Sequence, residues 1–144
     1  LLDQEGRNID LNLKGDNILG ETPFIMACKG GRTDVVKLLL DQSDIDLNTR
    51  DNYGTTAFMK ACGWGRKNVI KLLLDQSDRN INLNVKDNKE RTAFQMACVG
   101  GYKDVVKLLL KHSKVVDINI PESVALSKDI KDLIEKHCQR KYKL

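Results

Sequence analysis

The side chains of this chain best suited to chemistry are four cysteines and two histidines. Cys28, Cys62 and Cys98 each follow an alanine, at spacings of 34 and 36 residues, whereas Cys138, His112 and His137 lie near the C-terminus. No two cysteines are separated by only two residues, so the usual spacing of a zinc site is missing. We therefore expect free structural thiols, no metal and no other cofactor. Free buried thiols also favour a reducing compartment.

Catalytic motifs are missing from the sequence as well. It contains no G-x-x-x-x-G-K-[ST] phosphate loop, no H-E-x-x-H pair and no G-x-S-x-G nucleophile elbow. The glycines fall between predicted helices, where turn geometry accounts for them. The sequence therefore predicts neither an enzyme nor a small-molecule substrate.

The equal spacing of the cysteines belongs to a longer repeated pattern. Three segments, from Asp16, Asp51 and Asp87, each read as a turn, a short helix, a glycine loop and a second helix that ends in three leucines. Equivalent positions are Thr22, Thr56 and Thr92 at the helix starts and Gly31, Gly65 and Gly101 in the loops. A recurring period in this range is typical of a stacked repeat array, in which each helix pair buries its apolar faces against its neighbours.

These segments resemble ankyrin repeats. The resemblance rests on Thr22-Pro23-Phe24, its counterparts Thr56-Ala57-Phe58 and Thr92-Ala93-Phe94, the Ala-Cys pair and the glycine that follow, and the apolar second helix. It implies an all-α repeat solenoid of stacked helix-turn-helix ankyrin repeats with β-turn fingers. The chain departs from the family where a histidine is usual, at Ile25, Met59 and Gln95. Lys60 also stands where the family has leucine and the flanking repeats have Met26 and Met96.

The pattern predicts where each repeat begins and ends. The expected units are the tail of an incomplete N-terminal repeat at 1–15, whole ankyrin repeats at 16–50, 51–86 and 87–117, and a shortened C-terminal capping repeat with a basic tail at 118–144. Leu1-Leu2-Asp3-Gln4 matches Leu73-Leu74-Asp75-Gln76, so we expect an upstream repeat in the parent protein.

The shortened last unit has the features of a cap. We expect a short helix from Pro121 to about Leu126, followed by a final helix. In that final helix Lys131 and Glu135 occupy the positions of Val106 and Leu110, so its outward side is polar. A terminal repeat needs such a side because nothing packs beyond it.

Local signals place the elements within a repeat. Thr22 should cap a helix that runs from Pro23 to about Lys29, and Thr33 or Asp34 should open the second helix. That second helix is so apolar, from Val35 to Leu40, that we expect it to be covered on two sides, by its own partner helix and by the next repeat.

Asparagines recur in the linkers between the repeats. Asn12, Asn48, Asn84 and Asn119 should stack and bond backbone groups of adjacent fingers. A lesser alternative, implied by the ankyrin resemblance, is hydroxylation of Asn48 or Asn84.

Composition narrows the environment. The formal net charge is +4, and from Lys128 onward there are six Lys or Arg against three Asp or Glu, so much of the positive charge is at the C-terminus. The sequence shows neither a membrane span nor a signal peptide. We expect a monomer inside the cell, in the cytoplasm or the nucleus, that does not contact a membrane.

The ankyrin resemblance implies a non-catalytic scaffold for protein-protein interaction, which binds a partner protein on its concave finger and first-helix surface. Two alternatives remain open. One is a structural spacer within a larger protein, and the other is contact of the basic C-terminal tail with nucleic acid or another anionic surface, of which nucleic acid is the less expected.

Two aromatic residues mark the expected binding surface. Tyr53 lies on the finger of the middle repeat and Trp64 at the end of its first helix, and both types are frequent in binding hot spots. The alternative for Trp64 is packing against a neighbouring loop. A mixed rim that leans basic should flank them, which favours a partner with an acidic or mixed surface. The expected rim consists of Glu21, Lys29, Thr55, Met59, Lys60, Lys89, Arg91 and Gln95.

Overall fold

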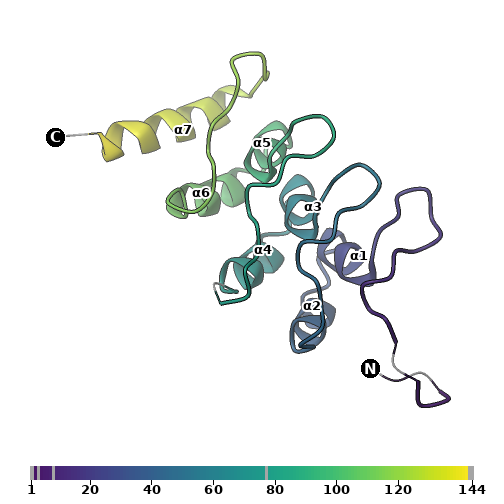
Figure 1. Ribbon diagram of the computed structural model, residues 1–144. Helices are drawn as coiled ribbons and strands as arrows, with labels where there is room; N and C mark the ends of the chain where they lie inside the picture. Colours follow the sequence, from purple (N-terminus) through teal and green to yellow (C-terminus); the bar gives the residue numbers. More distant parts are fainter. Residues whose placement is uncertain (1, 3, 8, 77, 143–144) are drawn as a thin grey trace.

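The computed structural model of the chain describes residues 2, 4–7, 9–76 and 78–142. These residues form seven α-helices and no β-strand. The helices are α1 (Pro23–Lys29), α2 (Thr33–Leu40), α3 (Ala57–Gly63), α4 (Lys67–Leu74), α5 (Ala93–Val99), α6 (Lys103–Lys111) and α7 (Lys128–Lys141). Figure 1 shows one row of inner helices, α1, α3 and α5, beside a row of outer helices, α2, α4 and α6, with the long loops projecting to one side. The predicted all-α solenoid is confirmed.

Each inner helix begins at the predicted threonine. The hydroxyl oxygens of Thr22, Thr56 and Thr92 accept hydrogen bonds, 3.2–3.3 Å long, from the backbone N–H groups three residues further on. Such a cap satisfies a backbone donor that has no partner inside the helix. The predicted bounds Pro23–Lys29 are those observed, and α2 begins at Thr33.

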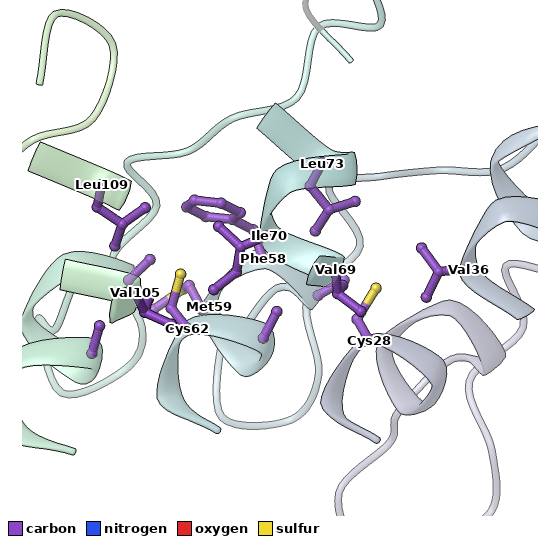
Figure 2. Close-up of a cluster of buried hydrophobic side chains, with 14 of the residues drawn as sticks. Cys28, Val36, Phe58, Met59, Cys62, Val69, Ile70, Leu73, Val105 and Leu109 are labelled. Carbon is purple, nitrogen blue, oxygen red and sulfur yellow. The ribbon is translucent and has the colours of Figure 1, made fainter. Parts of the chain in front are cut away.

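The core runs continuously along the stack. Figure 2 shows Phe58, Ile70 and Leu73 of the middle repeat between Val105 and Leu109 of the third repeat and Cys28 and Val36 of the first, all members of one buried cluster. Cys28, Cys62 and Cys98 are free and buried in this core, as predicted. Burial raises the pKa of Cys28 and of Cys98 to about 12, and it raises the pKa of Cys62 as well, with a smaller contribution from Cys98.

The outer helix of the first repeat packs against its partner α1 and against α4 of the next repeat, but part of its apolar surface remains exposed. Val35 and Leu38 of α2 are 36% and 65% exposed, whereas Val69 and Val105, at the positions equivalent to Val35, are buried. The outer helices α4 and α6 each pack against the outer helix of the preceding repeat. The described residues before α2 contain no outer helix that could cover Val35 in this way. The prediction that α2 is covered by its own partner and by the next repeat is confirmed.

The predicted asparagine ladder is present. Asn12, Asn48 and Asn84 each donate a side-chain N–H to a backbone carbonyl of the next linker, over 2.7–3.0 Å, and accept a backbone N–H from it over 2.7 Å. Asn119 lies at the end of this series, and its backbone N–H donates to Asp117 Oδ1. These bonds hold successive linkers in register.

The C-terminal unit differs from its prediction. No helix forms at 121–126; one turn is closed there by a hydrogen bond from Val124 N to Pro121 O. Ile120, which precedes Pro121, has no side-chain oxygen to cap a helix, unlike the threonines before α1, α3 and α5. In α7, Ile130 is buried against α6, while Lys131 and Glu135 are exposed.

Three expectations reach beyond the described residues. Leu1 and Asp3 of the N-terminal match, Asn8 of the incomplete first repeat, and the last two residues of the basic tail lie outside them.

Candidate functional site

A groove of about 600 Å³ lies between the second and third repeats. It is lined by the inner helices α3 and α5, by the finger loops 50–56 and 86–92, and by Val124 of the last loop. Eight of the ten predicted partner-binding residues line it: Tyr53, Thr55, Met59, Lys60, Trp64, Lys89, Arg91 and Gln95. Glu21 and Lys29 lie beside it, in the first repeat. The repeat pattern therefore locates one connected surface.

Two half-exposed aromatic rings stand over this groove. Trp64 is 52% exposed and Tyr53 is 50% exposed. Trp64 is the C-terminal cap of α3, and Lys29 Nζ of the preceding repeat lies 5.9 Å from the centre of its indole ring. The tryptophan therefore contacts the neighbouring repeat without being buried by it.

The finger backbone identifies the counterpart of Tyr53 in the first repeat. The carbonyl of Tyr53 accepts the backbone N–H of Asn88 over 3.0 Å, and the carbonyl of Leu19 accepts that of Asn52 over 2.9 Å. Leu19 is therefore the equivalent of Tyr53, which the sequence left open between Ile18 and Leu19.

Several residues predicted for the rim form the floor instead. Thr55, Met59 and Gln95 are buried. Gln95 Oε1 accepts the backbone N–H of Thr92, and Gln95 Nε2 donates to the carbonyl of Asn119 over 3.1 Å. Placing these three residues in an exposed rim was wrong, because the inner helices pack so closely that only the finger tips and helix ends remain open.

A buried ion group lies below the groove. Lys60 Nζ lies 3.1 Å from Glu21 Oε1 and 3.0 Å from Asp51 Oδ2, and Lys29 Nζ lies 3.2 Å from Glu21 Oε1. Glu21 and Asp51 are both buried, so Glu21 too does not belong to an exposed rim. Burial by itself would lower the pKa of Lys60, but the two carboxylates outweigh it and raise the pKa above its ordinary value.

A second ion pair belongs to the finger of the third repeat. Asp87 Oδ2 accepts hydrogen bonds from Arg91 Nε and Nη2 over 2.9 and 2.6 Å, and Asp87 Oδ1 accepts the backbone N–H groups of Lys89 and Arg91. Burial would raise the pKa of Asp87, but these donors outweigh it and hold the pKa below its ordinary value. The ammonium group of Lys89 is exposed and has no ion-pair partner among the described residues.

Sequence reasoning missed part of the apolar wall. Leu19, Met96, Val99 and Val124 also line the groove, and Val99 is 63% exposed. Val99 occupies the position of Lys29 and Gly63 at the end of an inner helix. The sequence could have indicated this part of the wall, because Val99 is apolar at a position that is polar in the first repeat.

The described residues form neither a metal site nor a membrane span. Within the described ranges, no group of three or more His, Cys, Asp or Glu side chains is placed to hold a metal ion. In the same part of the chain, every helix is too short or too polar to cross a bilayer.

The fold and groove define a helical repeat solenoid with an open concave surface. Family models for ankyrin repeats match residues 1–87 and 89–123, so the chain belongs to the ankyrin repeat family. Ankyrin repeats generally mediate protein-protein interaction and are typically non-catalytic.

Among solved structures, the chain is similar to one described as the predatory endopeptidase Bd0816 from Bdellovibrio bacteriovorus in complex with immunity protein Bd3460. The TM-score is 0.66 at 25% sequence identity, over 81% of this chain and 64% of the matched chain. This chain therefore spans somewhat less than two thirds of the length of the chain it matches. A search of the curated proteins found no match.

Proposed function

We propose that this chain is a non-catalytic scaffold that binds a partner protein in the groove between its second and third repeats. The observation that carries the proposal is the pair of half-exposed aromatic rings, Tyr53 and Trp64, over one groove. Large aromatic side chains contribute strongly to binding when a partner covers them. The solved structure that the chain resembles is itself described as a complex of two proteins, which supports the same role.

The scaffold favours binding because it is ordered before the partner arrives. The finger loops are tied to one another by Asn52, which donates to the carbonyl of Ile18, and by Asn88, which donates to the carbonyl of Asn52. A surface held in this way loses little conformational entropy on binding.

The test is capture of partners from a lysate of the source cells by the wild type and by Tyr53→Ala and Trp64→Ala. The matched control is Lys71→Ala, which changes an exposed side chain on the outer helix α4. We expect the aromatic variants to lose the captured protein, with affinity reduced by about 2 kcal/mol or more, while the control retains it.

The alternatives give different results in the same experiment. A protein captured equally well by all variants would contradict the groove as the binding surface. Capture by residues 128–144 alone would instead favour the basic tail, and a wild type that captures nothing would favour the structural spacer. These outcomes separate the scaffold from both alternatives.

A further inference from the structure

The charges in and below the groove are unevenly matched. Three carboxylates lie there, and each is already paired: Glu21 with Lys29 and Lys60, Asp51 with Lys60, and Asp87 with Arg91. Both oxygens of Asp87 are occupied, one by two backbone N–H groups and the other by the guanidinium group. A cationic group of a partner would therefore have to displace a buried ion pair, which is costly.

One cation in the groove wall remains uncompensated. Four cationic side chains, Lys29, Lys60, Lys89 and Arg91, face the three carboxylates, which leaves one net positive charge. It falls on Lys89, which is exposed on the finger and has no ion-pair partner in the described part of the chain. The groove therefore carries an excess positive charge that can bind an anionic group of a partner.

The walls beside Lys89 are apolar. Tyr53 and Trp64 stand on one repeat, and Met96 and Val99 on the next. The volume of about 600 Å³ lies in the range of about 300–1,000 Å³ that encloses molecules of drug size. A few consecutive side chains of an extended segment fit a space of this size.

We propose that the groove binds an extended segment of a partner protein that places an aliphatic or aromatic side chain between the Tyr53 and Trp64 rings and a neighbouring aspartate or glutamate on Lys89. This assignment of partner chemistry rests on the proposed function. The apolar side chain contributes most of the affinity through burial, and the carboxylate selects the segment by its charge.

The test uses peptides selected from a randomised display library against the whole chain. Peptides whose binding is lost with Trp64→Ala define the groove-dependent set. We expect this set to be enriched in aspartate or glutamate next to an aliphatic or aromatic residue. Each peptide is then compared with its Asp→Asn or Glu→Gln form by fluorescence anisotropy, on the wild type and on Lys89→Gln.

The four measurements form a double-mutant cycle, and we expect it to show a coupling free energy between the acidic residue of the peptide and Lys89. Neutralising the acidic residue should weaken binding to the wild type by about threefold to tenfold, as partly exposed ion pairs do, and should change binding to Lys89→Gln very little. Lys71→Gln, on the outer helix, should behave as the wild type.

Other results would overturn the inference. Groove-dependent peptides that are enriched in lysine or arginine, or an equal effect of neutralisation on the wild type and on Lys89→Gln, would contradict this partner chemistry while leaving the proposed function intact. A selection that yields no groove-dependent peptide contradicts the extended segment. Failure of the proposed function is recognised separately, by cellular partners whose capture does not depend on Tyr53 and Trp64.

Discussion

The ammonium nitrogen of Lys29 lies 5.9 Å from the centre of the Trp64 ring, so a side chain of the first repeat covers one face of the tryptophan of the second. A cation over an exposed ring contributes about 0.5–1 kcal/mol. The tryptophan is still 52% exposed, which suits a residue that is oriented by the scaffold and available to a partner.

Trp64→Ala should therefore leave the fold largely intact. We expect the free energy of unfolding, from urea denaturation, to fall by about 1 kcal/mol. The matched control is Tyr102→Ala, which removes a half-buried ring that packs on Gly65 and Gly100 and should cost more. A loss of 3 kcal/mol or more for Trp64→Ala would mean that the residue mainly packs between repeats.

The thiols should differ sharply in reactivity. The raised pKa of Cys28, Cys62 and Cys98 keeps them as thiols at pH 8, and burial blocks access, whereas Cys138 is half-buried. The thiolate is the reactive form. Mass spectrometry after a short exposure to iodoacetamide should show one modified cysteine, and none in Cys138→Ser. Rapid modification of three or four thiols in the folded protein would refute the assignment.

Asp87 should make stability depend on acid pH. Its pKa is lowered by folding, so its contribution is present above the unfolded value of about 3.9 and is lost as the pH falls through the folded pKa. We expect Asp87→Asn to cost about 1–3 kcal/mol at pH 7, through loss of charged hydrogen bonds, and less at pH 3. Urea denaturation at both values measures the difference.

The control for Asp87 is Asp16→Asn, at the exposed start of the first repeat, which should be near neutral at both pH values. A cost for Asp87→Asn that is the same at pH 7 and pH 3 would show that the carboxylate charge is unimportant.

Two loop glycines provide a paired test of close packing between repeats. Gly65 and Gly101 both have positive φ, +67° and +72°. A Cβ at Gly65 would lie 2.5 Å from Tyr102 Cδ1, whereas one at Gly101 would meet nothing within 4 Å. We expect Gly101→Ala to cost about 1 kcal/mol and Gly65→Ala clearly more, measured by thermal unfolding. Equal costs would mean that the Tyr102 ring moves aside freely.

The capping role proposed for the last unit, 118–144, can be tested on α7. Lys131 and Glu135 are exposed, so Lys131→Leu with Glu135→Leu should leave the fold intact and create an apolar patch that drives self-association. Sedimentation at increasing concentration measures this. A double variant that stays monomeric would contradict the cap, and Lys71→Leu serves as a control for a single exposed leucine.

The sequence predicted the repeat architecture because its signals are local and recur in register. The threonine caps, the cysteines beside small alanines and the loop glycines each follow from backbone geometry within a few residues, and repetition makes the pattern unambiguous. The asparagine ladder was predictable for the same reason, since equivalent linkers must lie beside one another in a stack.

The sequence did not predict local features that depend on a missing helix cap or on which helices lie beside a residue. Residues 121–126 were expected to be helical from their alignment with the repeat, but the preceding Ile120 cannot cap a helix as the threonines of the other repeats do. The exposure of Val35 and Leu38 likewise depends on the surroundings of α2, because no outer helix precedes it in the described chain.

For the groove, the sequence by itself determined which repeat carries Tyr53 and Trp64 and which inner-helix position carries Lys60. Tertiary structure decided which of the predicted residues are accessible, since Glu21, Thr55 and Met59 are buried by the adjacent repeat or finger. It also decided the charge balance, because Lys60 is neutralised by carboxylates from two different repeats, while Lys89 has no ion-pair partner among the residues that the structure describes. Burial and ion pairing depend on distances between residues that are far apart in the chain, and no local pattern encodes those distances.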